Sequence, residues 1–325
     1  MFGLAFGDAL GGPTEFLTVA QIEGRYGLGG PRELEGDPVL VTDDTQMTLA
    51  VASALHEMPN PDSQALSESL RQAFVEWLIS PENNRAPGNT CLDACAKLSK
   101  GVPWQEASVA GSKGCGANMR VAPVGLVPGY DLETLAGVAQ LQAGLTHGHP
   151  TALTASELTA YAVRALRDGA AFSDLPALLR SRCHEQRRVY RHEWLGPLWK
   201  RSGLDSPTEF IQRGWDDCLV ALDRLDAAVK LRDDNLDPCI RTGQGWIAEE
   251  ALSTALLCTL RNIHDPVSGL ARAANTSGDS DSIACLAGAF LGVAHGMSAW
   301  PISWVPRIEY AEKISKFGQV WDVHQ

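Results

Sequence analysis

The chain has 325 residues, 45% of them hydrophobic, and carries a formal net charge of −12. This length allows a large buried core, and the acidic balance argues against non-specific binding of nucleic acid or of an anionic membrane. A phosphate-bearing small ligand is still allowed, because bound divalent cations can invert the local field.

The sequence shows neither a membrane span nor a secretory signal. The longest apolar run, residues 283–297, contains His295 and is too short to cross a bilayer. The first residues include Asp8 and no basic cluster, unlike a signal peptide. The eight cysteines are scattered, without a CxxC pair or a Cys/His spacing typical of zinc sites, and several lie in apolar segments. We therefore expect a reduced, cytoplasmic protein.

Glycines recur every four residues in the first expected helix, residues 3–12, at Gly3, Gly7 and Gly11. Each glycine costs a helix about 1 kcal/mol relative to alanine, so such a series is typical of a helix face that another backbone approaches closely. A matching series lies near the C-terminus, at Ala284, Gly288, Gly292 and Gly296. The pattern predicts two core helices, packed either against each other or independently.

Pro13 is expected to end or kink the first helix, and Glu15 follows it closely. Residues 17–41 are rich in glycine and proline, which predicts a long loop with one short helix. Long loops of this kind often border functional sites. Within this loop, residues 39–41 are the best candidate for extended structure.

Two short segments concentrate carboxylates and hydroxyls directly before apolar helical segments. The first reads Thr42-Asp43-Asp44-Thr45-Gln46-Met47, and the second reads Gly278-Asp279-Ser280-Asp281-Ser282. Taken singly, each is explained by a helix N-cap, Asp43 or Asp44 in one and Asp281 or Ser282 in the other. A cap needs only one such residue, however, and each segment offers three or four.

Together the two segments favour one divalent-cation site built from both ends of the chain. Neighbouring carboxylates repel, and burying them is unfavourable unless a cation or a donor compensates. Asp, Ser and Thr oxygens are hard ligands that suit Mg²⁺ or Mn²⁺ better than zinc. A site shared by residues near 43 and near 280 also predicts a single domain spanning residues 1–325.

Helical periodicity dominates the rest of the chain. We expect helices over residues 45–58, 64–79, 90–100, 131–145, 151–168, 247–262, 266–274 and 283–294. Asn89 or Thr90 is the expected N-cap of the third of these helices, and residues 173–240 look less regular. The predicted fold class is all-α, a single compact multi-helix domain with on the order of a dozen helices.

Three further segments allow two interpretations each. Residues 111–119 form a glycine-rich loop that either cradles a phosphate with backbone N–H groups or is a simple turn. His147 and His149 lie between two expected helices. Histidines at such a joint can bind metal, but more commonly they cap a helix end or contact a polar ligand. A docking patch or a solvated helix face would explain a basic run, which consists of Arg182, Arg187, Arg188, Arg191 and Lys200.

These motifs together resemble the ADP-ribosylglycohydrolase family over nearly the whole length of the chain. The resemblance rests on residues 7–11 with Glu15, and on residues 42–47, 85–90, 114–123, 146–147, 245–252 and 278–282. The order and spacing of these motifs agree with the family, and the two acidic motifs are the most specific.

The resemblance implies an all-α fold with a two-metal centre that binds two divalent cations, Mg²⁺ or Mn²⁺. It implies hydrolysis of the glycosidic bond between ADP-ribose and a modified protein side chain, with arginine favoured. The implied metal ligands are Thr42, Asp43, Asp44, Asp279, Asp281 and Ser282. The implied catalytic residues are Glu15, near the scissile bond, with Asp44 and Asp279. The implied contacts to ADP-ribose are Gly88, Gly114, Cys115, Gly116, Asn118, Met119, His147, Gly245 and Trp246.

The chain departs from the family pattern in three ways. The family's second acidic motif usually reads Gly-Gly-Asp-Thr-Asp-Thr, whereas this chain has Ser277 at its start and ends it with Ser282, which keeps a hydroxyl ligand. Cys115 stands where asparagine is common, which changes a side chain but leaves the backbone cradle intact. The chain also starts close to its first motif, which leaves open whether a further segment precedes it.

Two other functions remain open at this point. The same site could act on another conjugate, such as O-acetyl-ADP-ribose, ADP-ribosyl-serine or -threonine, or a modified nucleic acid. The chain could also be a non-catalytic ADP-ribose-binding protein. Glu15 and the complete acidic set argue against a pure binder, because glycosidic cleavage passes through an oxocarbenium-like state that nearby carboxylates stabilise.

Overall fold

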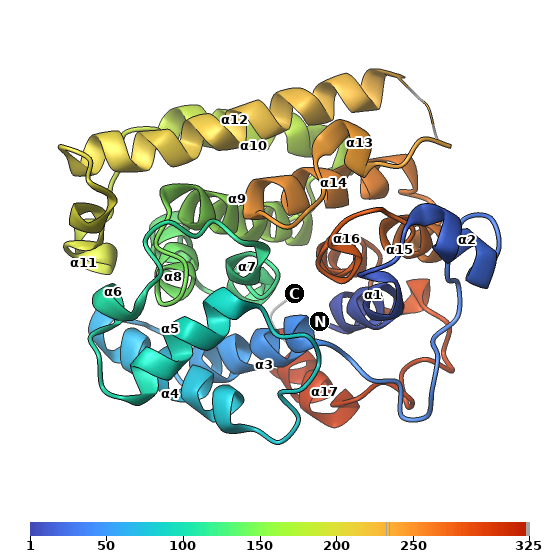
Figure 1. Cartoon of the computed structure of the whole chain (residues 1–325), viewed down its shortest axis with the longest axis horizontal. Coiled ribbons are helices and arrows are strands. Elements are labelled where there is room, and N and C mark those ends of the chain that lie inside the picture. Colours follow the sequence, from blue (N-terminus) through green and yellow to red (C-terminus); the bar gives the residue numbers. More distant parts are fainter. Residues whose placement is uncertain (232, 234, 323–325) are drawn as a thin grey trace.

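The first helix, α1 (Phe2–Gly11), packs along its length against α16 (Ser280–His295), near the other end of the chain (Figure 1). The backbones come so close that a Cβ added to Gly7 would overlap the carbonyl oxygen of Ala284. Gly3 lies equally close to the backbone of α16. The two glycine series therefore face each other, as the first interpretation of the pattern predicts.

The last glycines of the two series have different surroundings. Gly11 lies against the backbone of Asp281 in the first turn of α16, so this contact sets the spacing between the end of α1 and the start of α16. Gly296 instead follows the end of α16 with a left-handed φ of 67°, and no atom lies near its Cβ position.

The computed structural model describes residues 1–231, 233 and 235–322. The last three residues of the predicted domain, residues 323–325, therefore lie outside the described part. The longer helices besides α1 and α16 are α3 (Asp43–His56), α4 (Ser63–Ile79), α5 (Asn89–Ser99), α8 (Leu132–Gly144), α9 (Pro150–Arg167), α10 (Leu175–Gln186), α12 (Pro207–Leu231), α14 (Ala248–Arg261), α15 (Pro266–Ala274) and α17 (Ala311–Trp321). The shorter ones are α2 (Val19–Tyr26), α6 (Trp104–Ala107), α7 (Ala122–Leu126), α11 (His192–Leu195) and α13 (Cys239–Thr242), with the 3-10 helices η1 (Gly12–Thr14), η2 (Cys115–Ala117), η3 (Phe172–Asp174), η4 (Leu198–Ser202) and η5 (Met297–Ala299).

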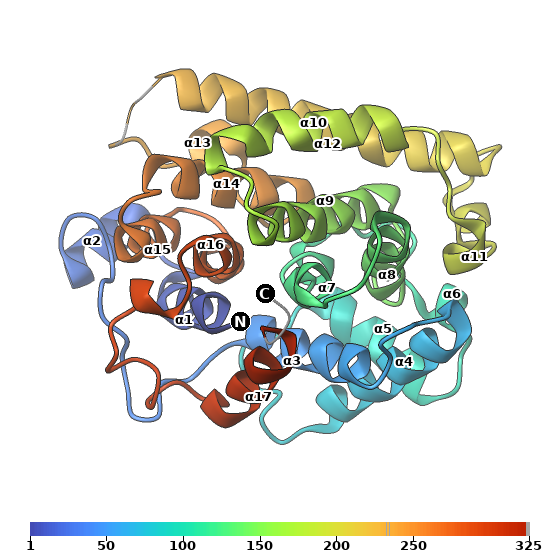
Figure 2. The same cartoon turned by 180° about the vertical axis from the view of Figure 1, so that it is seen from behind.

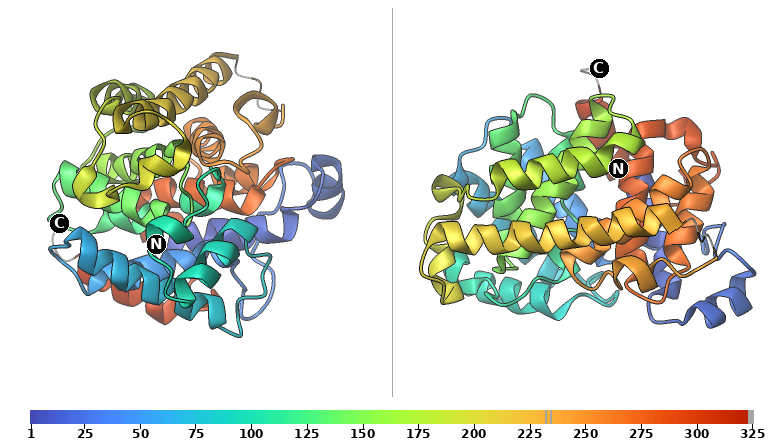
Figure 3. Two further views of the ribbon diagram at one scale, coloured as in Figure 1. Left: turned by 60° about the vertical axis from the view of Figure 1, so that its left-hand side comes forward. Right: turned by 90° about the horizontal axis from the view of Figure 1, so that it is seen from above.

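The helices are arranged in layers (Figure 1). Helices α10 and α12 lie side by side as an outer layer, which the view from above in Figure 3 shows clearly, and α12 covers α9 and α14. Beneath them, α9 packs on α8 and α14 packs on α16. The opposite side consists of α3, α4 and α5, with α17 against α3 (Figure 2). The fold is one compact all-α domain, as predicted.

Pairing between extended segments among the described residues is limited to isolated bridges. One joins Val39 to Ile308, within the segment expected to be extended, and another joins Gly114 to Ile247. No helix among the described residues is long and apolar enough to cross a membrane.

The expectation of irregular structure over residues 173–240 is wrong, although residues 232 and 234 lie outside the described part. Helix α12 alone has 25 residues. Its buried face repeats at helical spacing, through Phe210, Ile211, Gly214, Trp215, Cys218, Ala221, Leu222, Leu225 and Ala228. Gly214 and the many charged residues on the exposed face obscure this spacing in the sequence.

Both interpretations of the basic run are wrong for two of its members. Arg182 and Arg191 are buried, and both form ion pairs with the fully buried carboxylate of Glu157. Arg187 pairs with Asp216 of α12 at the surface. The run therefore contributes to packing between α9, α10 and the segment before α11.

The predicted N-cap of α5 is also wrong. Gly88 occupies the N-cap position without a side-chain cap, and Asn89 is the first helical residue. The hydroxyl of Thr90 is used elsewhere, in a hydrogen bond of 2.9 Å with the hydroxyl of Ser112. A side chain that bonds another loop is not free to cap its own helix.

The α1–α16 contact predicts that Gly7→Ala lowers the free energy of unfolding by several kcal/mol, because the new methyl group overlaps backbone that cannot move aside. Gly24→Ala is the matched control. Gly24 lies within α2 with open space at its Cβ position, so alanine there should stabilise by up to about 1 kcal/mol. Urea unfolding of both variants checks this, and equal stabilities would contradict the close backbone contact.

Candidate functional site

The N-terminus of α3 is fixed by Thr42 and by a buried acid of α1. Thr42 is the N-cap, and its hydroxyl accepts a hydrogen bond of 3.2 Å from the N–H of Asp44. Asp8 accepts bonds of 3.1 Å from the N–H of Thr42 and 3.0 Å from the N–H of Thr45, and also accepts the Thr45 hydroxyl. Asp43 and Asp44 therefore lie in the first turn of the helix rather than capping it.

Asp8 is a site residue that the sequence analysis missed. The only indication in the sequence was that Asp8 is the single carboxylate on an otherwise apolar helix with a glycine stripe. A charge at such a position has to be buried.

The N-terminus of α16 lies opposite. Asp279 occupies its N-cap position without a capping hydrogen bond, and its N–H donates to the carbonyl of Gln244 at 2.8 Å. Asp281 accepts a bond of 3.0 Å from the N–H of Ser282. Neither Asp281 nor Ser282 caps the helix, so the simple cap explanation fails for this segment as well.

Glu15 meets these two aspartates. Thr14, just before it, anchors the chain through hydrogen bonds of 2.9 Å to the hydroxyl of Ser280 and 2.7 Å to the carbonyl of Ala274. Carboxylate oxygens of Glu15, Asp279 and Asp281 all lie within 4.8 Å of one another. Glu15 is half-buried, whereas the two aspartates are buried.

The resulting acid cluster has six carboxylates that shift one another's pKa. Its members are Asp8, Glu15, Asp43, Asp44, Asp279 and Asp281. Burial raises the pKa of Asp8 to about 7, of Asp43 to about 8 and of Glu15 to about 9, and the Asp281 carboxylate is the next cause in each case. Burial and then Asp281 also raise the pKa of Asp44 and of Asp279 well above the ordinary value.

The donor set of this cluster fits divalent cations. No lysine, arginine or histidine among the described residues forms an ion pair with any of the six carboxylates. The Oδ2 atom of Asp44 is buried without a hydrogen-bond partner, although buried polar atoms are rarely left so. The hydroxyl of Thr42 contacts Asp281, and Ser282 contacts Asp279. Hard oxygen donors with uncompensated negative charge suit Mg²⁺ or Mn²⁺.

The glycine-rich loop lies beside the cluster. The N–H of Cys115 donates to the carbonyl of Trp246 at 3.0 Å, next to the bridge between Gly114 and Ile247. The Cys115 thiol is buried and contacts Ser282, and Asp279 is among the groups that raise its pKa.

Gly245 completes the contact between this loop and the cluster. It has a φ of 83° and lies against Ile283 and the side chain of Asp279, so a side chain there would be strained and crowded. The two loops therefore lie against each other and against the acid cluster.

The other predicted contacts lie at different depths around this surface. The N–H of Gly88 donates to the carboxylate of Asp43 at 3.4 Å. The His147 ring packs against the glycine loop, within 3.5 Å of the Cβ positions of Gly114 and Gly116. Met119 is buried, with its sulfur 4.0 Å from the hydroxyl of Ser282.

Asn118, near the end of the glycine-rich loop, is turned into the core. Its side chain is fully buried and donates to the carbonyl of Ala248 at 3.0 Å. His149 caps α9 by accepting a bond of 3.2 Å from the N–H of Thr151. His147 packs its ring against Gly114 and Gly116, whereas His149 contacts the loop through its backbone N–H, which donates to the carbonyl of Ser112 at 3.3 Å.

An exposed aromatic pair borders Glu15. Phe16 and Trp246 stack with ring centroids 6.2 Å apart and are 71% and 41% exposed. Large exposed aromatic side chains are a common feature of binding surfaces. Phe16 had not been predicted, because a single aromatic residue in a turn carries no signal in the sequence.

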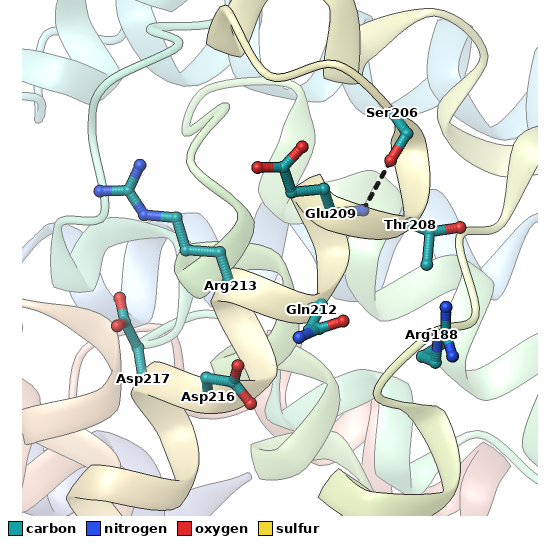
Figure 4. Close-up of a pocket in the computed structure, with 8 residues that line it drawn as sticks. All are labelled: Arg188, Ser206, Thr208, Glu209, Gln212, Arg213, Asp216 and Asp217. Carbon is teal, nitrogen blue, oxygen red and sulfur yellow. Dashed lines mark hydrogen bonds between the residues drawn. The ribbon is translucent and has the colours of Figure 1, made fainter.

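A separate groove of about 450 Å³ runs along the start of α12. Figure 4 shows its lining, Arg188, Ser206, Thr208, Glu209, Gln212, Arg213, Asp216 and Asp217. None of the predicted site residues lines it. Its acids are largely satisfied within the protein, since Asp216 pairs with Arg187 and Asp217 accepts the hydroxyl of Thr151 at 2.7 Å.

Comparisons with known proteins agree with the sequence motifs. A sequence model of the ADP-ribosylglycohydrolase family matches residues 1–325. The chain is 25% identical to the ADP-ribosylarginine hydrolase Tri1 of Pseudomonas putida (strain GB-1), over 98% of this chain and 76% of that protein. It is 26% identical to the ADP-ribosyl-[dinitrogen reductase] glycohydrolase of Rhodospirillum rubrum, over 94% of this chain and 88% of that protein.

A solved structure agrees as well. An ADP-ribosylglycohydrolase-related protein complex contains a chain that superposes with a TM-score of 0.65 at 23% identity, over 97% of this chain and 93% of that one. At this identity the likeness shows a shared fold.

The raised pKa values predict how stability depends on pH once divalent cations are removed with a chelator. Unfolded carboxyl groups ionise near pH 4, at about their ordinary pKa, whereas Asp8, Asp43 and Glu15 hold their protons to about pH 7, 8 and 9. The folded state therefore binds more protons across this window, and its melting temperature should fall as pH rises from about 5 to about 9.

Adding Mn²⁺ should raise the melting temperature more at about pH 8 than at about pH 5, because protons compete with the cation for the same oxygens. Thermal melts with and without Mn²⁺ check both trends. A melting temperature that rises over this pH range, or a Mn²⁺ effect that shrinks with pH, would contradict the cluster as a cation site.

Proposed function

Since the chain belongs to the ADP-ribosylglycohydrolase family, we propose that it removes ADP-ribose from arginine side chains of modified proteins, with divalent cations bound at the acid cluster. As an enzyme of this family it hydrolyses conjugates of ADP-ribose. The observation that carries the proposal is the meeting of Glu15 with Asp279 and Asp281, from opposite ends of the chain. A cytoplasmic location, expected from the sequence, remains part of the proposal.

Glu15 is the acid that a substrate can reach. It is half-buried, whereas the five aspartates of the cluster are buried beneath it. In the reaction the bond between the ribose C1 and the guanidine nitrogen breaks, a water oxygen bonds to C1, and the leaving nitrogen gains a proton. A carboxyl group at this position can take the proton from the water or deliver one to the nitrogen.

Thr42, Asp43, Asp44, Asp279, Asp281 and Ser282 would hold the cations in this proposal. When bound there, two divalent cations would orient ribose hydroxyls and lower the pKa of a water molecule. Asp8 has a positioning role, because its hydrogen bonds to Thr42 and Thr45 hold the first turn of α3 in place.

The glycine-rich loop and its neighbour would bind the pyrophosphate. Gly114 and Gly116 are half-buried beside the cluster, and the bridge to Ile247 holds the loop against residues 244–247. Backbone N–H groups in such loops form concave sites for phosphate oxygens.

Two observations support arginine as the acceptor: the names of relatives and an exposed aromatic pair beside Glu15. Two of the relatives are named for ADP-ribosylarginine hydrolysis. In this chain, the stacked Phe16–Trp246 pair lies beside Glu15, and both side chains are partly exposed. A guanidinium group binds well to such faces through cation–π contacts.

Turnover of matched peptides carrying ADP-ribosyl-arginine, -serine or -threonine tests this function. We expect hydrolysis of the arginine peptide in Mg²⁺ or Mn²⁺, none in chelator, and none by Asp281→Ala with its helical circular dichroism retained. Preference for the serine peptide would show the acceptor to be wrong, and full activity in chelator would show the cation requirement to be wrong.

The position of Glu15 predicts a large effect on kcat alone. Glu15→Gln keeps the shape and the hydrogen-bonding capacity but cannot exchange a proton, so kcat should fall by about 10²- to 10⁴-fold. The affinity for ADP-ribose and the melting temperature should change far less. Steady-state kinetics with calorimetry of ADP-ribose binding checks this, and wild-type turnover by Glu15→Gln would remove Glu15 from the mechanism.

A further inference from the structure

Arg120, three residues after η2, is a fully buried arginine without a carboxylate partner. Its guanidinium donates to the side-chain oxygen of Gln142 at 2.8 Å and to the carbonyl of Gln142 at 2.7 Å. It lies over the ring of Phe74, 4.4 Å from the centroid. No carboxylate among the described residues forms an ion pair with it.

A buried cation without a counterion needs a compensating environment. Part of it comes from the C-terminus of α8, because the Gln142 carbonyl belongs to the last turn of that helix, where the helix dipole is negative. Burial lowers the pKa of Arg120, but guanidinium groups remain charged in proteins. The arginine is thus a fixed positive charge in the core beside the glycine loop.

A further hydrogen-bond partner of Arg120 connects it to the glycine loop. A guanidinium N–H donates to the hydroxyl oxygen of Thr146 at 2.7 Å, and the same oxygen lies 2.8 Å from Nδ1 of His147. The alternative acceptor for the Thr146 proton is the carbonyl of Ala143, which is 3.4 Å away. The shorter contact takes the proton, so Thr146 donates to Nδ1.

The positive charge of Arg120 also favours donation of the Thr146 proton to Nδ1 of His147. A hydroxyl that already accepts a bond from a cation is a poorer acceptor of a second bond and a better donor. Burial, and then the charge of Arg120, also lower the pKa of His147 well below its ordinary value, so its ring is neutral and carries one proton. Because Nδ1 accepts from Thr146, that proton is on Nε2.

The Nε2 edge of His147 faces the glycine loop. It lies 3.3 Å from the Cβ position of Gly114 and 3.4 Å from that of Gly116, and among the described residues it has no hydrogen-bond partner. The absence of side chains on the two glycines is what allows the ring to lie there.

We propose that Arg120 and Thr146 are positioning residues that fix His147 with its proton on Nε2, so that His147 donates a hydrogen bond to a phosphate oxygen of the ligand at the glycine loop. This inference rests on the proposed function for the identity of the ligand, ADP-ribose. It adds a neutral hydrogen-bond donor, the Nε2–H group of His147, beneath the loop. Arg120 and Thr146 in the core, rather than the ligand, fix the orientation of this donor.

The position of the proton is measured directly by two-dimensional ¹H–¹⁵N NMR of histidine-labelled protein. The chain has eight histidines, and the spectrum of His147→Gln identifies the signals of His147. The hydrogen-bonded series Arg120–Thr146–His147, called the relay below, predicts the Nε2–H tautomer in the wild type near neutral pH. A proton on Nδ1 would overturn it, whatever the stability of any Thr146 variant.

Calorimetry with ADP-ribose tests the consequence for binding. Thr146→Ser keeps the hydroxyl and should bind within about twofold of the wild type, whereas Thr146→Val should bind about tenfold more weakly, as expected for a weakened bond to a charged group. Thr154→Val is the matched control, because the Thr154 hydroxyl is also buried and bonded, to the Thr151 carbonyl at 3.3 Å, on α9. Its affinity should be unchanged.

Equal affinity of Thr146→Val and Thr154→Val would overturn the relay, since a loss of stability alone would affect both. If the wild type did not bind ADP-ribose at all, the proposed function and the ligand of His147 would both be wrong. Binding by the wild type with the proton on Nδ1 would overturn the relay alone.

Discussion

The close backbone contact between α1 and α16 is the constraint on which the site depends. Glycines let the two helices approach until Gly7 meets Ala284 and Gly11 meets Asp281. This contact places the start of α16 at the end of α1, where Glu15 follows, and Asp8 of the same helix holds the first turn of α3. One helix pair thus brings together three chain segments that lie far apart in the sequence.

The carboxylates of this site lower the free energy of unfolding. Six carboxylates lie in or under the protein surface with repulsion among them and without a basic partner in the described residues, which is unfavourable by the usual rules for buried charge. The surrounding helices, largely apolar and tightly packed, have to hold them in place. Such an arrangement is expected where function rather than stability selects the residues. Asp44, with one buried oxygen left without a partner, is the clearest example.

The sequence predicted the features that have a local signature. The glycine series predicted two core helices and offered their mutual contact as one of two arrangements, and two dense acidic segments predicted a shared cluster, because each has more acids than a cap requires. It did not predict features that depend on distant partners. Asp8 looks like an ordinary acid until its bonds to Thr42 and Thr45 are seen, and Arg182 looks like a surface charge until it meets Glu157. Helix α12 was missed for a different reason, because its charged exposed face masks a regular apolar one.

The acid cluster is proposed to bind divalent cations between the first turns of α3 and α16. Crystals grown with Mn²⁺, with diffraction recorded above the manganese absorption edge, test it most directly. We expect anomalous difference peaks bounded by Asp43, Asp44, Asp279 and Asp281, within reach of Glu15. Peaks only elsewhere on the molecule, or none in this cluster at saturating Mn²⁺, would contradict it.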